Sequence, residues 1–257
     1  MFNLRFTKDY LLHTLNAKNR HGLHSPFVYR LVDTVVYDLE VKKVYQEIEK
    51  LRHGLLNDTR SITLTDLLTG EYSSKKISLV ATETLRISKI DQLLYRLAAY
   101  LKPVNMLEIN ACPGITSLYL HYAAPKANFY AWEEHAETFD IAQDTFKKAA
   151  VADINLVTGS YEKTLLRLLN ALDKLDLVLI NCGHEKQIAL KYFELCLPKS
   201  HEKTMLVFDG IYQNKGMTEA WNKIKAHPKV TVTVDLFWVG LVFFRKGQAR
   251  EDFKIKF

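Results

Sequence analysis

The sequence predicts an α/β fold in which a doubly wound, mostly parallel sheet follows a helical N-terminal region. After Lys102-Pro103, short apolar runs alternate with amphipathic segments of helical period, the pattern of a parallel sheet with helices on both faces. The last two apolar runs are only a few residues apart, too close for a crossover helix, so they must pair antiparallel. The chain has 257 residues, 48% hydrophobic and 25% charged, which excludes disorder and allows one sizeable core.

The first part of the chain predicts helices. Between about residues 27 and 56, apolar positions recur at helical spacing, for instance at Val44, Ile48 and Leu51, and a second such stretch covers residues 88–101. The segment His21–Phe27 contains two histidines but no acidic partner at ligand spacing. It predicts a turn that leads into the first long helix, with Phe27 packed inward. We predict a helical cap over residues 1–87 and a second domain over residues 88–257.

The second part predicts seven strands, the last two of them in the terminal antiparallel hairpin. The strands are expected at Val104–Ile109, Asn128–Trp132, Ile154–Val157, Leu175–Ile180, Met205–Asp209, Val230–Asp235 and Val239–Arg245. The helices between them are expected near residues 115–124, 136–150, 161–172, 185–197 and 215–226. The apolar run Phe237–Phe244 is interpreted as a buried terminal strand.

Charge and cysteine content narrow the class of protein. The formal net charge is +6, but basic and acidic residues interleave and no basic stripe with aromatic residues is present, so we expect no nucleic-acid partner. The three cysteines, Cys112, Cys182 and Cys196, form no CxxC pair, which favours a reducing compartment. Charged residues appear too early for a signal peptide, and no apolar run approaches the roughly 20 residues of a membrane span. The sequence therefore predicts a cytoplasmic protein without a membrane partner.

Polar residues follow five of the predicted strands, where open α/β sheets bind their ligands. These tips are the segments Glu108–Ser117, Glu133–His135, Thr158–Tyr161, Asn181–His184 and Asp209–Tyr212.

Here the chain resembles the class I S-adenosylmethionine-dependent methyltransferases, and more closely bacterial small-molecule O-methyltransferase-like proteins that carry an RHGxHSPF segment. That segment stands here as Arg20–Phe27. The resemblance also covers Leu107–Leu120, Leu175–Phe193, Gly216–Trp221 and Gly240–Arg245. It implies a Rossmann-like sheet of seven strands, S-adenosylmethionine as the cofactor, and methyl transfer to a small hydroxylated acceptor.

The first tip matches the cofactor loop of that family in part. Glu108, Gly114 and Ser117 match its acidic residue and glycine-rich turn, whereas Asn110 stands where the first glycine is expected. Because Asn tolerates a positive φ better than other non-glycine residues, we expect the turn to be retained.

Three further tips complete the predicted cofactor site. A carboxylate at Glu133 could accept hydrogen bonds from both ribose hydroxyls. Ser160 and Tyr161 lie where the resemblance implies contacts with the adenine, and Asn181 is counted with them.

The fourth and fifth tips indicate how the acceptor would lose its proton. Metal-dependent relatives hold Mg²⁺ with several carboxylates, but here Asn181 and Gly210 leave only Asp209 as a carboxylate, so the pattern disfavours a metal. His184 and Asp209 are the candidate catalytic bases.

Asn110, Asn181 and Gly210, which depart from the family pattern, also favour an alternative. In it, the protein has a methyltransferase-like fold that has lost catalytic activity and that senses the cofactor or binds another protein. The sequence disfavours an RNA methyltransferase, because the expected signatures are missing and Cys182 lacks the surroundings of an activated thiolate. It also disfavours a nicotinamide dehydrogenase, because the GxGxxG opening is missing. The cap helices or the terminal hairpin could pair two chains into a homodimer. The identity of the acceptor depends on pocket shape, which the pattern does not reveal.

Overall fold

The computed structural model describes residues 4–65 and 72–257, which group into two compact units. The first unit contains the described residues up to Leu39 together with Pro103–Ile109 and Leu168–Phe257. The second contains Glu40–Lys102 and Asn110–Arg167. The domain boundary expected between residues 87 and 88 stays a prediction.

Six strands of the main sheet belong to the first unit, in the order β10-β8-β9-β7-β6-β3. Their bounds are β3 (Asn105–Ile109), β6 (Leu175–Ile180), β7 (Ser200–Asp209), β8 (Val232–Asp235), β9 (Val239–Phe243) and β10 (Glu251–Lys254). β3, β6 and β7 run parallel, while β9 lies antiparallel to both β7 and β8. β6 and β9 are almost entirely buried, as expected of strands covered on both faces.

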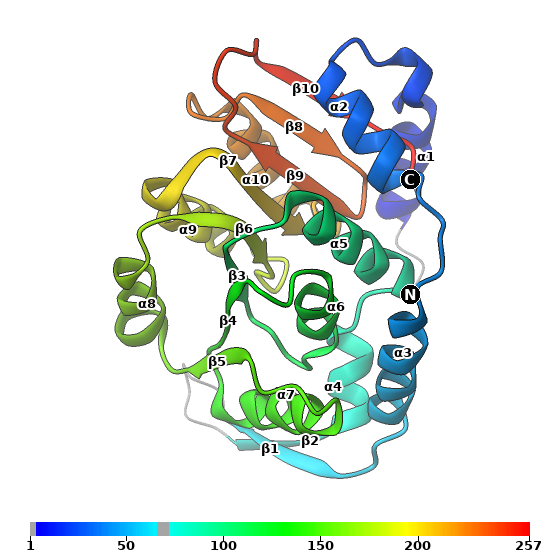
Figure 1. The fold of residues 1–257 in the computed structure, drawn as a ribbon. Coiled ribbons are helices and arrows are strands. Elements are labelled where there is room, and N and C mark those ends of the chain that lie inside the picture. Colours follow the sequence, from blue (N-terminus) through cyan, green and yellow to red (C-terminus); the bar gives the residue numbers. More distant parts are fainter. Residues whose placement is uncertain (1–3, 66–71) are drawn as a thin grey trace. The chain divides into compact units, whose positions relative to one another are not determined.

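The helices of the first unit come from both ends of the chain. α1 begins the described chain, α2 lies beside the three strands β8, β9 and β10 in Figure 1, and α9 contacts α10. The bounds are α1 (Leu4–Asn16), the short helices η1 (Arg20–Gly22) and η2 (Val32–Val36), α2 (Pro26–Leu31), α9 (Lys186–Cys196), η4 (Leu197–Lys199) and α10 (Lys215–Ala226).

The segment from His21 to Phe27 leads into α2, as predicted. The Ser25 hydroxyl accepts a hydrogen bond from the Val28 backbone N–H, and Pro26 occupies the first turn, where its missing N–H costs nothing. Phe27 packs edge-on against Phe243 at 5.0 Å between ring centroids. The side chain of His21 lies outside the described residues. The described part of the segment therefore forms a helix start that packs against the sheet.

The second unit holds two strands of the main sheet and a set of helices. β4 (Asn128–Glu133) and β5 (Ile154–Thr158) pair in parallel. α6 contacts α3, α5 and α7, and α7 contacts both β4 and β5. The helices are α3 (Lys43–Leu56), α4 (Ile77–Thr84), α5 (Ser88–Leu101), α6 (Ile115–Ala123), α7 (Ala136–Lys148) and η3 (Tyr161–Leu165), and the boundary between the units falls within α8 (Leu166–Ala171).

The predicted fold class is confirmed, with four corrections. The main sheet has eight strands rather than seven, because β10 adds a parallel edge strand that contains only one buried apolar residue, Phe253. The hairpin of β8 and β9 is antiparallel as predicted, but it does not end the sheet. The expected helical cap contains a short antiparallel hairpin, β1 (Ser61–Thr65) with β2 (Tyr72–Lys76). The helical stretch expected over residues 27–56 is interrupted between η2 and α3.

The run Phe237–Phe244 also divides differently from the prediction. The strand covers only Val239–Phe243, while Phe237 and Trp238 form the turn before it. A backbone N–H at Phe237 donates to the Asp235 carboxylate at 3.0 Å, which holds this turn closed. Among residues 4–65 and 72–257, no helix is long and apolar enough to cross a membrane.

Candidate functional site

The loop after β3 contains two residues with positive φ before α6 begins. Asn110 has a φ of 60°, so the positive φ expected at this position is confirmed. Its backbone N–H donates to the Trp132 carbonyl at 2.8 Å, which fixes the start of the loop beside the end of β4. Gly114, with a φ of 91°, is the N-cap of α6. The free N–H groups and the dipole at this helix start favour a negatively charged group.

Gly114 is required by packing as well as by its backbone angle. A Cβ atom at this position would lie 2.9 Å from the Phe146 ring of α7 and 3.3 Å from the Ala142 backbone. The close approach of α6 and α7 thus depends on a glycine here.

A buried ionic network supports the first turn of α6. Asp91 is 0% exposed, accepts a hydrogen bond from the Thr116 hydroxyl at 2.7 Å, and is paired with the Arg52 guanidinium. Arg52 also donates to Glu49 at 2.9 Å. Burial alone would lower the pKa of Arg52, but Asp91 and Glu49 outweigh it and raise the pKa. The guanidinium therefore stays charged, and α3, α5 and α6 are tied together by polar contacts.

Glu133, the last residue of β4, is 4% exposed and aimed at the loop after β3. One carboxylate oxygen accepts from the Cys112 backbone N–H at 2.9 Å, and the other accepts from the Thr138 hydroxyl at 2.8 Å. Burial raises the pKa of Glu133 above its ordinary value, and these two donors only partly oppose the rise. The ionised form of this buried carboxylate would be stabilised by any further hydrogen-bond donor that a ligand brings.

Ser160 and Tyr161 are placed at the start of a helical turn after β5. The Ser160 hydroxyl accepts from the Lys163 backbone N–H at 3.4 Å and caps η3, of which Tyr161 is the first residue. The preceding Gly159 carbonyl accepts from the Trp132 indole N–H at 3.1 Å. This loop is therefore anchored to the end of β4, beside Glu133, within the same unit.

The remaining predicted residues lie in the first unit. Glu108 is buried within β3, and the Asn181 backbone N–H donates to the Ile109 carbonyl at 3.2 Å, which places Asn181 at the end of that strand. Cys182 is buried beside Met217, and burial raises the pKa of its thiol to about 11. A neutral, buried thiol is no nucleophile at neutral pH, in agreement with the sequence interpretation.

His184 and Asp209, the two candidate bases, are brought together at the ends of β6 and β7. His184 Nε2 lies 4.0 Å from Asp209 Oδ2, and both side chains are partly exposed. The backbone of His184 has a φ of 60°, and its carbonyl accepts from the Asn214 side-chain amide at 2.7 Å. Asn214 also caps α10 by accepting from the Met217 N–H, so one residue anchors both the helix start and the histidine.

Gly210 makes room for the imidazole. Its φ is 63°, and a Cβ there would lie 2.4 Å from the His184 ring. We expect Gly210→Ala to lower the free energy of unfolding by roughly 2–3 kcal/mol, about 1–2 of it from the left-handed backbone and the rest from displacement of the imidazole. Urea unfolding measures the loss, and the NMR signals of the His184 ring report its displacement.

The matched control for Gly210 is Gly183→Ala. Gly183 has a similar φ of 58°, but nothing lies within 4 Å of a Cβ built there. This variant should show the backbone cost alone. If both variants lose the same free energy of unfolding, displacement of the His184 ring does not destabilise the protein.

A buried group that the sequence interpretation missed lies behind the loop after β7. Asp235 is 2% exposed and accepts from His13 Nε2 at 3.0 Å, from the Tyr212 hydroxyl at 2.7 Å and from the Phe237 N–H. Burial would raise the pKa of Asp235, but its bonds to His13 and Tyr212 outweigh it and lower the pKa. Tyr212 stacks on Phe237 at 4.9 Å between ring centroids. The carboxylate thus joins α1, the loop after β7 and the β8–β9 turn.

The predicted site residues are divided between the two units. Within the second unit lie Asn110, Gly114, Ser117, Glu133, Ser160 and Tyr161; within the first lie Glu108, Asn181, His184 and Asp209. Across the described ranges, no group of three or more His, Cys, Asp or Glu side chains is arranged to hold a metal ion.

The strand order of the first unit, the loop after β3 and the start of α6 belong to a fold that this chain shares with solved structures of methyltransferases. Residues 107–211 match the model of a family described as a methyltransferase domain. The resemblance stated from the sequence is confirmed at the level of this domain and fold.

Solved structures of O-methyltransferases have the same fold. One from Bacillus cereus, in complex with S-adenosylhomocysteine, is 16% identical with a TM-score of 0.56, over 83% of this chain and 94% of that one. The O-methyltransferase TomG of Streptomyces achromogenes, in complex with S-adenosylmethionine, is 15% identical with a TM-score of 0.56, over 83% and 95%. The methyltransferase PaMTH1 of Podospora anserina, bound to S-adenosylhomocysteine, is 14% identical with a TM-score of 0.59, over 87% and 97%. No curated protein matches the chain.

Proposed function

We propose that this protein is an S-adenosylmethionine-dependent methyltransferase that methylates a hydroxyl group of a small acceptor. The observation that carries the proposal is the loop after β3, where Asn110 and Gly114 take positive φ values ahead of α6 and Glu133 faces the loop. Solved structures of the same fold hold S-adenosylmethionine or S-adenosylhomocysteine, which supports the choice of cofactor.

The residues of the second unit fit the cofactor by their chemistry. The start of α6 would favour the carboxylate of the methionine part, because helix N–H groups and the positive end of the helix dipole lie at such a start. Glu133 would accept hydrogen bonds from the ribose hydroxyls, which would offset the cost of keeping its carboxylate buried and ionised. Tyr161 would offer an aromatic face to the adenine.

The residues of the first unit are assigned to the acceptor. S-adenosylmethionine, when bound, supplies a methyl group on a sulfonium centre that an oxygen nucleophile displaces. Asp209 or His184 would take the proton of the acceptor hydroxyl, with Asn214 fixing the His184 backbone carbonyl and Gly210 leaving room for the imidazole. The remaining acceleration would come from positioning and from exclusion of water.

The test of this proposal is a calorimetric titration of the purified, cofactor-free protein with S-adenosylhomocysteine and with S-adenosylmethionine. We expect a Kd in the micromolar range, about −8 kcal/mol, for one site per chain. A folded protein that binds neither ligand would contradict the proposal. It would favour the alternative in which the fold serves as a protein-interaction module, and partner capture would then be the next experiment.

Asp209→Asn separates the acceptor chemistry from cofactor binding. We expect turnover with a responsive hydroxylated acceptor to fall roughly 10²- to 10⁴-fold, because the variant cannot take a proton. The Kd for S-adenosylhomocysteine should stay within about twofold of the unmodified protein. Asp176→Asn, at the opposite end of β6, is the control and should retain turnover. Equal losses of turnover and cofactor affinity in Asp209→Asn would show a structural role instead.

A further inference from the structure

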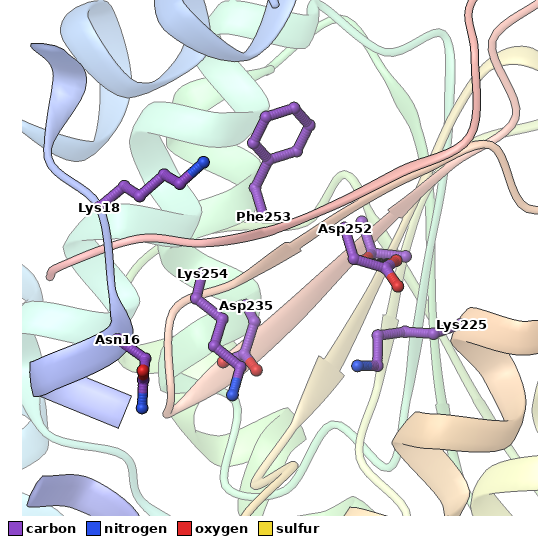
Figure 2. Close-up of a pocket in the computed structure, with 8 residues that line it drawn as sticks. Asn16, Lys18, Lys225, Asp235, Asp252, Phe253 and Lys254 are labelled. Carbon is purple, nitrogen blue, oxygen red and sulfur yellow. Dashed lines mark hydrogen bonds between the residues drawn. The ribbon is translucent and has the colours of Figure 1, made fainter. Parts of the chain in front are cut away.

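A cavity in the first unit is lined by none of the residues assigned to the cofactor or the acceptor. It has a volume of about 260 Å³ and is lined by Asn16, Lys18, Lys225, Thr233, Asp235, Asp252, Phe253 and Lys254. These residues come from the end of α1 and the segment that follows it, from α10, from the edge strand β10 and from its neighbour β8 (Figure 2). All but Phe253 are polar or charged, so the lining suits a polar ligand.

The alternation of side chains along β10 decides which residues share the cavity. Asp252 and Lys254 point to one face of the sheet, next to Thr233 and Asp235 of the parallel neighbour β8. Figure 2 shows Lys225 reaching toward this face from α10, while Lys18 and Phe253 lie on the other side of the β10 ribbon. This face of the cavity therefore carries the ammonium groups of Lys225 and Lys254 and the carboxylates of Asp235 and Asp252.

The two lysines of this face are available to a ligand. In the part of the chain that the structure describes, neither Lys225 nor Lys254 has an ion-pair partner. Lys225 Nζ lies 6.0 Å from the centre of the Trp221 ring, a weak cation–π contact. An ammonium group without a carboxylate at contact distance can bind an anion without first giving up a protein partner.

The two carboxylates do not cancel this attraction. Asp235 directs its oxygens to His13, Tyr212 and the Phe237 N–H, and these donors spread its charge within the protein. Asp252 accepts one hydrogen bond, from the Thr233 hydroxyl at 2.6 Å, and its further lone pairs can accept from a ligand. The face thus combines sites for an anion with an acceptor for hydroxyl groups.

We propose that this cavity binds a small organic anion that also carries hydroxyl groups, such as a polyol phosphate or a hydroxy acid. Lys225 and Lys254 would hold the anionic group, and Asp252 would accept a hydrogen bond from a ligand hydroxyl. At about 260 Å³ the cavity is smaller than the roughly 300–1,000 Å³ of drug-sized sites, so the ligand has only a few carbon atoms. The site is independent of the methyltransferase proposal.

Glycerol 3-phosphate is the probe that tests the site by calorimetry on the full chain. We expect one binding event per chain, weaker binding of inorganic phosphate, and no heat from glycerol, which lacks the anionic group. A folded protein that does not bind glycerol 3-phosphate would overturn the proposal. Equal affinity for inorganic phosphate would overturn the role given to Asp252.

Charge-removing variants locate the binding. Lys225→Gln and Lys254→Gln should each raise the Kd for glycerol 3-phosphate at least tenfold, whereas Lys223→Gln, exposed on the same helix but outside the cavity, should leave it unchanged. Circular dichroism confirms that each variant is folded. Affinity that is undiminished in both cavity variants would overturn the proposal. Binding of S-adenosylhomocysteine should persist in all three variants, which keeps this test separate from that of the proposed function.

Discussion

Asp91→Ala is expected to lower the free energy of unfolding by about 3–5 kcal/mol, because it leaves the buried Arg52 guanidinium without its main partner. The same change removes the acceptor of the Thr116 hydroxyl in the first turn of α6. Urea unfolding followed by circular dichroism measures the loss. A decrease below about 1 kcal/mol would show that water or another group compensates for the missing charge.

Two further variants separate burial from charge. Asp144→Ala removes a carboxylate that also pairs with an arginine, Arg60, but on the exposed surface, and should cost less than about 1 kcal/mol. The double variant Asp91→Leu with Arg52→Met removes both buried charges and should recover part of the stability that Asp91→Ala loses. If the double variant is no more stable than Asp91→Ala, the loss comes from packing and not from an uncompensated charge.

Glu133→Ala is expected to weaken binding of S-adenosylhomocysteine roughly 10- to 100-fold, as the loss of charge-assisted hydrogen bonds worth about 1.5–3 kcal/mol predicts. The matched control is Glu134→Ala, which removes a neighbouring carboxylate that is less buried. Glu133→Gln retains an acceptor oxygen and should lie between the two. Unchanged affinity in Glu133→Ala, measured by calorimetry, would remove Glu133 from the cofactor site.

The raised pKa of Glu133 also predicts how this binding depends on pH. In the free protein, burial raises the pKa of the Glu133 carboxyl above its ordinary value of 4.5. The protonated carboxyl therefore contributes to the free energy of unfolding at low pH, and this contribution is lost as the pH rises from the pKa of the unfolded chain to that of the folded protein. A ligand that donates to the carboxylate favours ionisation. Affinity for S-adenosylhomocysteine should therefore rise with pH above 4.5 and then level off once Glu133 is ionised.

The central strands could be predicted because their signals are local. β6 and β9 are continuous apolar runs, and the antiparallel pairing of β8 with β9 follows from the short connection between them. Asn110 shows the same principle, since its side chain type anticipated its positive φ. Such features depend on a few neighbouring residues and leave a pattern in the sequence.

The missed features depend on contacts between distant residues. β10 has one buried apolar residue, so it becomes a strand only because β8 offers an edge for pairing. Asp235 is separated from His13 by 222 positions, and the residues next to Asp235 do not indicate that its carboxylate contacts an imidazole. In the hairpin of β1 and β2, the side chains of β2 are mostly polar and exposed, and β1 alternates Ile62 and Leu64 with hydroxyl residues over only five positions, a run that the sequence interpretation missed.

The parallel bridge between Lys18 and Ile255 has a consequence for how the protein is made. The Lys18 N–H donates to the Lys254 carbonyl at 2.8 Å, and the Lys256 N–H donates to the Lys18 carbonyl at 3.1 Å, so the early and late parts of the chain complete one structure. During synthesis, the residues of the second unit emerge before the strands β6 to β10 that complete the first unit. α1 contacts Phe237 through Phe6 and Tyr10, and Asp235 through His13, so these contacts can form only after residues 235–237 have been synthesised.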